Sequence, residues 1–162
     1  MPKNICRIAC AQVKPQLEKL NTYLAINETF DLGLEKWFTV EIAVALTNAG
    51  YIVKINPIQP DKRKPDLEIL LPKNGQKILV ELKAGSYERN YIWQLMDGAH
   101  KYTYPEFIGC VFLGRFRQGI SQTGLQTLLK GNGSQQCLVV DLKRINRQSH
   151  WWVGFLRAKT GI

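Results

Sequence analysis

Residues 65–83 read PDLEILLPKNGQKILVELK, two apolar runs joined by the polar segment PKNGQ. The pair Asn74-Gly75 favours a tight hairpin turn, because both residues accept the positive φ angles that such turns need. Side chains alternate between the two faces of a strand. Glu81 and Lys83 therefore share one face of the second run, and folding of the hairpin would bring Asp66 beside them. The sequence predicts that two carboxylates and an ammonium group converge at the edge of a buried sheet.

This combination of side chains has a chemical use. Two carboxylates held close together repel each other unless a cation lies between them. Mg²⁺ prefers such hard oxygen ligands, and water and substrate phosphates complete its coordination. A neighbouring lysine can orient a water molecule and offset negative charge in the transition state. The pattern therefore favours metal-assisted hydrolysis of a phosphodiester, with Mg²⁺ as the cofactor and Mn²⁺ as a substitute.

Pro65-Asp66, followed after fourteen residues by Glu81-Leu82-Lys83, resembles the motif of the PD-(D/E)XK nuclease superfamily. That superfamily includes restriction endonucleases, Holliday-junction resolvases and Mrr-type enzymes. The resemblance covers residues 34 to 113 and implies an α/β fold: a restriction-endonuclease-like core, with a mixed central sheet flanked by helices in the order α-β-β-β-α-β. It also implies that Asp66, Glu81 and the backbone carbonyl of Leu82 bind metal, while Lys83 positions the attacking water. The alternative is a solvated surface ion pair, worth about 0–1 kcal/mol.

Further site residues follow from positions on the expected helices and strands. Residues 34–49 form a good helix, and a helix before the first strand often adds a glutamate to the metal site in this superfamily. Glu41 is favoured over Glu35, because Glu41 stands among apolar residues where a carboxylate needs a partner, whereas the helix dipole alone explains an acid near the N-terminus. Gln94, on the helix expected after the motif, resembles a glutamine of related nucleases that points at the site. Glu68 is an alternative outer ligand of the metal or its water.

Composition places the chain among ordinary globular proteins. It has 162 residues, of which 45% are hydrophobic and 22% charged. It contains neither an apolar run of the roughly 18–20 residues that a membrane span needs nor the apolar core of a signal peptide, so we expect a cytoplasmic protein without a membrane partner. The four cysteines show no zinc-binding spacing with the two histidines, and we expect buried free thiols.

The positive charge of the chain favours a nucleic-acid partner. The formal net charge is +9 and the isoelectric point is about 9.5, and a basic surface attracts polyanions. Exposed basic residues are often only solvated, but three groups lie beside expected strands or the proposed site. We expect nucleic-acid contacts from these groups, namely Lys62, Arg63, Lys64, Arg115, Arg117, Lys143 and Arg144.

The chain is expected to form one nuclease domain over residues 1–162. Residues 1–27 would be a helical extension, residues 34–142 the core, and residues 143–162 a basic and aromatic tail. Residues 107–113 would form a strand parallel to the one that bears Glu81. The aromatic residues of the tail would either stack on nucleic acid or close the core or a dimer interface.

The sequence therefore predicts a Mg²⁺-dependent endonuclease, a deoxyribonuclease that hydrolyses phosphodiester bonds of DNA. Selectivity for DNA structure, or a place in a defence or mobile-element system, fits a chain of one domain. A homodimer is expected because cutting both strands of duplex DNA requires two active sites, and a partner protein could supply specificity. The alternatives are a catalytically silent nucleic-acid-binding or assembly protein with the same fold, and an RNA-directed nuclease.

Overall fold

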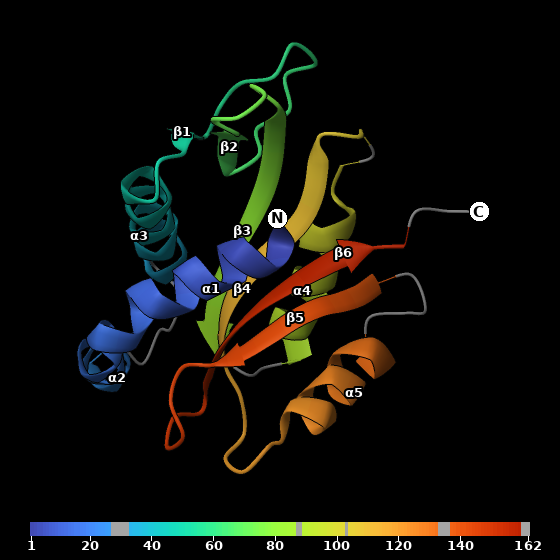
Figure 1. The fold of residues 1–162 in the computed structure, drawn as a ribbon. Coiled ribbons are helices and arrows are strands. Elements are labelled where there is room, and N and C mark those ends of the chain that lie inside the picture. The colour runs from blue at the N-terminus through green and yellow to red at the C-terminus, as the bar shows by residue number, and fades with distance from the viewer. Residues whose placement is uncertain (27–32, 87–88, 103, 133–136, 160–162) are drawn as a thin grey trace.

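The computed structural model describes residues 1–26, 33–86, 89–102, 104–132 and 137–159. In these residues six strands form one mixed sheet, in the order β1-β2-β3-β4-β6-β5, and helices cover both of its faces (Figure 1). The strands are β1 (Ile52–Ile55), β2 (Leu67–Leu70), β3 (Lys77–Ser86), β4 (Phe107–Arg115), β5 (Cys137–Arg144) and β6 (Trp151–Ala158). The helices are α1 (Pro2–Val13), a 3-10 turn η1 (Lys14–Gln16), α2 (Leu17–Ile26), α3 (Leu34–Asn48), α4 (Arg89–His100) and α5 (Gln122–Asn132).

This architecture confirms the expected class, an α/β fold with a mixed sheet flanked by helices. The order from α3 to β4 is α-β-β-β-α-β, as the sequence predicted. Strands β3 and β4 are parallel, with α4 as the crossover between them. A parallel pair needs such a crossover, because a tight turn can join only antiparallel strands.

The hairpin of β2 and β3 has an unequal pair of strands. The strands are antiparallel, with Leu67 opposite Val80, and Gly75 in the turn has a φ of 66°. Strand β2 has four residues and β3 has ten, so β3 runs on past its last pairing with β2. From Glu81 onward, the edge of β3 on the β2 side has no neighbouring strand.

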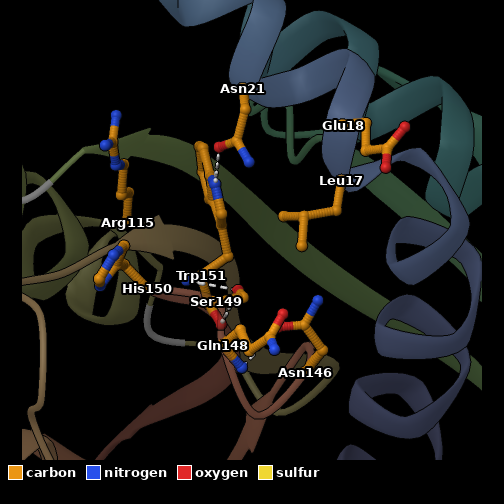
Figure 2. Close-up of a pocket in the computed structure, with 9 residues that line it drawn as sticks. All are labelled: Leu17, Glu18, Asn21, Arg115, Asn146, Gln148, Ser149, His150 and Trp151. Carbon is orange, nitrogen blue, oxygen red and sulfur yellow. Dashed lines mark hydrogen bonds between the residues drawn. The ribbon is translucent and has the colours of Figure 1, made fainter.

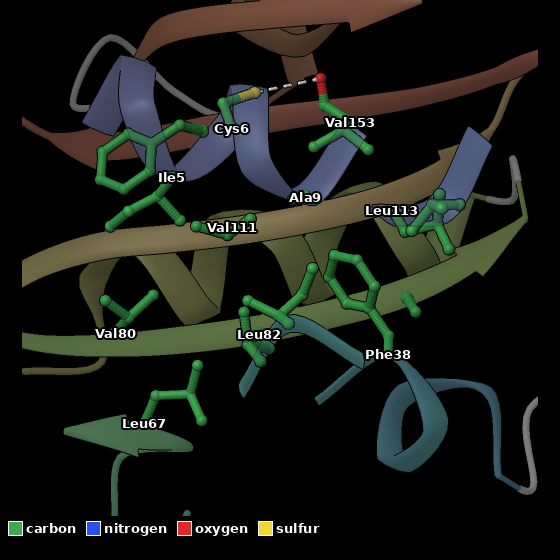
Figure 3. Close-up of a cluster of buried hydrophobic side chains, with 14 of the residues drawn as sticks. Ile5, Cys6, Ala9, Phe38, Leu67, Val80, Leu82, Val111, Leu113 and Val153 are labelled. Carbon is green, nitrogen blue, oxygen red and sulfur yellow. Dashed lines mark hydrogen bonds between the residues drawn. The ribbon is translucent and has the colours of Figure 1, made fainter. Parts of the chain in front are cut away.

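Two hydrophobic clusters lie on opposite faces of the sheet, and alternate residues of β3 enter the first of them. Figure 3 shows the first cluster, in which Val80 and Leu82 pack with Phe38 of α3 and residues of α1. The second cluster joins α4 and α5 to Cys110 and Phe112 of β4. Since neighbours along a strand point to opposite faces, Glu81 and Lys83 point away from the first cluster and toward α4.

The first helix and the last strand both belong to the packed fold. Helix α1 lies across the sheet and contributes fully buried residues to the first cluster (Figure 1). Strand β6 lies between β4 and β5, inside the sheet. Trp151, Trp152 and Phe155 are each at most 3% exposed. Of the two roles expected for these aromatic residues, closing the core is the one observed.

Two further expectations concern cysteines and membranes. All four cysteines are free, and Cys6, Cys110 and Cys137 are buried, whereas Cys10 is partly exposed. In the described part of the chain, no helix has both the length and the apolar character needed to cross a membrane.

Replacement of Gly109 should test how tightly β4 and β6 approach. Its φ is 135°, and an added Cβ would overlap the carbonyl oxygen of Leu156. We expect Gly109→Ala to lower the free energy of unfolding by about 2 kcal/mol or more, because both the backbone and the packing are strained. The measurement is urea denaturation followed by circular dichroism.

Gly131→Ala is the matched control, because Gly131 lies in α5 with open space around the position of an added Cβ. Alanine favours a helix over glycine by up to about 1 kcal/mol, so this variant should be as stable as the parent or slightly more so. Equal losses in the two variants would contradict the close approach at Gly109.

Candidate active site

Asp66 closes the open edge of β3 with its side chain. It directly precedes β2, and its Oδ2 accepts a hydrogen bond of 2.7 Å from the backbone N–H of Leu82. The side chain thus accepts a backbone hydrogen bond from β3 at a position where β2 has no residue paired with it. Because the N–H and C=O groups of one strand residue point to the same edge, the Leu82 carbonyl faces the same side as the Asp66 carboxylate.

Glu81 is a buried carboxylate with one paired and one unpaired oxygen. The residue is 1% exposed. Its Oε1 lies 2.7 Å from Lys101 Nζ and 3.2 Å from Lys83 Nζ. Its Oε2 is buried and has no hydrogen-bond partner among the described residues. A buried charged oxygen without a partner is costly, and this atom is therefore a candidate ligand atom.

Lys83 is held between two glutamates. Its Nζ lies 3.2 Å from Glu81 Oε1 and 3.3 Å from Glu35 Oε1. Burial alone would lower the pKa of Lys83, but the negative charges of Glu81 and Glu35 outweigh it and raise the pKa above its ordinary value. These contacts favour the protonated form of Lys83, which is a cation and a hydrogen-bond donor.

The two carboxylates of the site are harder to ionise than ordinary ones. Burial raises the pKa of Asp66, against the opposing effect of the hydrogen bond from Leu82. Burial also raises the pKa of Glu81, and the negative charge of Asp66 raises it further, against Lys83 and Lys101. The carboxylate of Asp66 thus disfavours ionisation of Glu81, which is a condition that a bound cation relieves.

The glutamate from α3 that reaches the site is Glu35, whereas the sequence interpretation favoured Glu41. The Oε2 of Glu41 accepts hydrogen bonds from Gln12 Nε2 at 2.6 Å and Gln16 Nε2 at 2.9 Å. Those amide groups, from α1 and η1, are the partners that the Glu41 carboxylate needs among the apolar residues of α3. The first turn of α3 instead lies near the open edge of β3, where Glu35 contacts Lys83.

Lys101 is the residue of the site that the sequence motif does not include. It follows α4 and makes the shortest ion pair of Glu81. Gly98 of the same helix lies against the site, since a Cβ there would stand 3.5 Å from Glu81 Cγ and 3.6 Å from Lys83 Cε. Gln94 and Gly98 are four residues apart and lie on one stripe of α4, and Lys101, directly after the helix, is three residues further along the chain. That spacing is the signal in the sequence from which Lys101 could have been found.

Gln94 and Glu68 differ in how the structure places them. Gln94 is exposed, on the stripe that borders the site but one turn beyond Gly98. Its role there stays a prediction. Glu68 pairs with Lys54 at 3.2 Å and accepts a hydrogen bond from Gln59 at 3.2 Å, so its carboxylate already has partners outside the site.

The seven expected nucleic-acid contacts fall into two regions. Lys62, Arg63 and Lys64 are exposed on the loop that leads to Asp66, and the Lys64 carbonyl accepts a 2.9 Å hydrogen bond from Tyr102. Arg115, Arg117, Lys143 and Arg144 are exposed at the other end of the sheet, near the start of β6. Only the first region adjoins Asp66.

A cavity of about 550 Å³ lies in the second region, between α2 and the turn before β6. Figure 2 shows the residues that line it. Arg115 and His150 line it, and Asn21 accepts a hydrogen bond of 3.0 Å from the indole N–H of Trp151. None of Asp66, Glu81 or Lys83 lines this cavity, so it is separate from the candidate site.

Comparisons with protein-family models, curated proteins and solved structures found no match to this chain. The geometry of the site is therefore the basis on which a function can be proposed.

The site offers Mg²⁺ a small set of oxygen ligands. Among the residues that the structure describes, no three histidine, cysteine or acidic side chains form a metal-binding group. Asp66 and Glu81 are two carboxylates, and Mg²⁺ is commonly bound through one or two carboxylates together with water and phosphate. The unpaired Oε2 of Glu81 and the raised pKa values of Asp66 and Glu81 are the observations that fit such a cation.

Thermal unfolding should detect this cation. Mg²⁺ at about 100 times its Kd would stabilise the protein by about 2.7 kcal/mol, or raise Tm by about 5–10 °C. Because the raised pKa of Asp66 disfavours its ionised form in the fold, its contribution to stability is lost as pH rises through that pKa. Asp66→Asn should therefore keep or raise Tm at neutral pH in EDTA, and should abolish the response to Mg²⁺.

Asp97→Asn is the control, because Asp97 is an exposed acid on the outer face of α4. It should respond to Mg²⁺ as the parent protein does. A metal response that survives Asp66→Asn would place the cation elsewhere.

Proposed function

We propose that this chain is a Mg²⁺-dependent endonuclease that hydrolyses phosphodiester bonds of DNA. We also propose that its fold has a restriction-endonuclease-like core, because its motif resembles that of the PD-(D/E)XK superfamily. The observation that carries the proposal is the convergence of Asp66, Glu81 and Lys83 at the open edge of β3. These three residues match the motif one by one. The α-β-β-β-α-β order around them supports the same fold.

Each residue of the site has a role in this proposal. Asp66, Glu81 and the Leu82 carbonyl would hold the cation. Mg²⁺, when bound, supplies positive charge that stabilises the phosphate oxygens in the transition state. Lys83, kept protonated by its two glutamates, would position the attacking water and donate a hydrogen bond to the developing negative charge. Glu35 would fix the position of Lys83.

The charge around the site supports DNA as the substrate. The net charge is +9, and Lys62, Arg63 and Lys64 are exposed on the loop that ends at Asp66. Such residues can position a phosphate backbone without reading its sequence. The homodimer and a partner protein that supplies specificity remain predictions, as does selectivity for particular DNA structures.

One observation favours a second candidate, a nucleic-acid-binding or assembly protein without catalysis. Lys83 and Lys101 already contact Glu81 Oε1. Two lysines balance much of the charge on the carboxylates without any metal. A cleavage assay with defined metals separates this candidate from the nuclease.

Cleavage should depend on Lys83 and on the metal. We expect the purified protein to cut supercoiled plasmid or a synthetic four-way junction in Mg²⁺ or Mn²⁺ and not in EDTA. Lys83→Met and Asp66→Asn should each lower the rate by about 100-fold or more, because each removes charge stabilisation or ligation in the transition state. Lys73→Met is the control, since Lys73 is exposed at the hairpin turn, far from Asp66 along β2.

Cutting that survives both site variants would assign the activity to another site or to a contaminant. Metal-insensitive binding without cutting by the parent protein would favour the non-catalytic candidate.

The two glutamates of α3 provide a second test. Glu35→Gln should lower the cleavage rate by about 10-fold, as loss of a residue that orients a catalytic group commonly does. It should also lower the pKa of Lys83, and so shift the alkaline limb of the pH–rate profile to lower pH. Glu41→Gln should leave rate and profile unchanged, because Glu41 contacts Gln12 and Gln16. The reverse result would restore the original preference for Glu41.

A further inference from the structure

A groove of about 610 Å³ opens near the candidate site, where α4 ends. It lies between the first residues of β4 and the last residues of β6. Tyr102, Tyr104 and Phe107 form its aromatic wall, and Arg157, Lys159 and His100 supply polar and basic groups. Arg157 and Lys159 are exposed.

The three aromatic rings form one cluster. Tyr102 and Tyr104 stack with centroids 5.5 Å apart, and Phe107 meets Tyr102 edge-on at 5.0 Å. All three rings are only partly buried. An aromatic cluster left partly exposed in a groove offers π-faces and edges to a planar ligand.

Tyr102 connects this groove to the candidate site. Its hydroxyl donates a 2.9 Å hydrogen bond to the Lys64 carbonyl, two residues before Asp66. The ammonium of Lys101 lies 5.4 Å from the centre of the Tyr102 ring and 2.7 Å from Glu81 Oε1. The guanidinium of Arg63 lies 5.2 Å from the centre of the Tyr104 ring. Basic groups thus stand beside the aromatic wall on the side that faces the carboxylates.

We propose that this groove binds unpaired nucleotides of a DNA strand, while a phosphate of the same strand reaches Asp66 and Glu81. This inference rests on the proposed nuclease function and names its substrate class. Strand β3 is separated from β6 by β4, and adjacent strands are ~4.8 Å apart. The groove therefore lies on the order of 10 Å from Glu81, a few nucleotides along one strand.

The chemistry of the groove selects unpaired bases. Every base has a π-face that can pack against the exposed part of the aromatic wall, and basic residues beside the rings can bind the phosphates on either side. A base inside a duplex is already stacked and cannot enter a groove. The substrate would then be DNA with an overhang, a flap or an open junction, and a blunt duplex would lack the groove contact.

Binding without chemistry provides the test. Asp66→Asn protein in EDTA is titrated into a fluorescein-labelled blunt hairpin duplex and into the same duplex with a single-stranded overhang, and anisotropy gives Kd. Stacking of one base is worth about 5-fold or more in affinity, so the overhang should bind at least about 5-fold more tightly. Tyr104→Leu and Arg157→Ala, added to Asp66→Asn, should each reduce this preference.

Arg147→Ala is the control matched to Arg157→Ala. Both arginines are exposed and each variant loses one positive charge, but Arg147 lies in the turn between β5 and β6, at the opposite end of β6. Arg147→Ala should weaken the binding of both DNAs by the same factor. If Tyr104→Leu fails to fold by circular dichroism, Arg157→Ala decides, because its side chain is exposed. Photocrosslinking of 5-iodouracil in the overhang should label Tyr102 or Tyr104.

Equal affinity for blunt and overhang DNA would overturn the inference. So would a preference that Arg157→Ala and Tyr104→Leu leave intact. The parent protein is assayed for Mg²⁺-dependent cleavage in parallel. Cleavage without any preference for the overhang would refute only the proposed role of the groove. A preference for the overhang without cleavage would refute the proposed nuclease activity and leave the groove as a binding site.

Discussion

The hydrogen bond between the Asp66 carboxylate and the Leu82 N–H is the contact on which the candidate site depends. Strand β3 outruns β2, so its edge would expose unpaired backbone groups there. Asp66 satisfies one of them with a side chain, and this fixes its carboxylate next to Glu81. The same geometry leaves the Leu82 carbonyl facing the carboxylates. A short strand beside a long one thus creates both the opening and the ligands that line it.

Lysines from two elements offset the free-energy cost of burying the Glu81 carboxylate. Lys83 comes from the same strand and Lys101 from the end of α4, and both contact one oxygen of Glu81. Glu35 in turn offsets the charge of Lys83. The second oxygen of Glu81 keeps no partner among the described residues. The negative charge of Glu81 is therefore compensated at Oε1 only, and Oε2 is the atom at which a bound cation would add the most stabilisation.

Local patterns predicted much of this arrangement, and long-range packing decided the rest. The turn at Asn74-Gly75 and the period-two pattern were sufficient to place Asp66 beside Glu81, because a hairpin is a local structure. The choice between Glu35 and Glu41 depended on whether α1 supplied amide partners, which no pattern within α3 could indicate. The position of β6 inside the sheet likewise depended on pairing with β4, about forty residues earlier in the chain.

The side chain of Asp66 also bears on self-association. An open strand edge is a template on which another polypeptide can add a strand, and proteins commonly protect such edges with charge. The Asp66 carboxylate occupies the Leu82 N–H and places a negative charge beside the unpaired part of β3. The residue proposed to bind metal would thus also protect this edge of β3 from pairing with another strand. Asparagine in its place would retain a hydrogen-bond acceptor, whereas alanine would remove both the ligand and this protection.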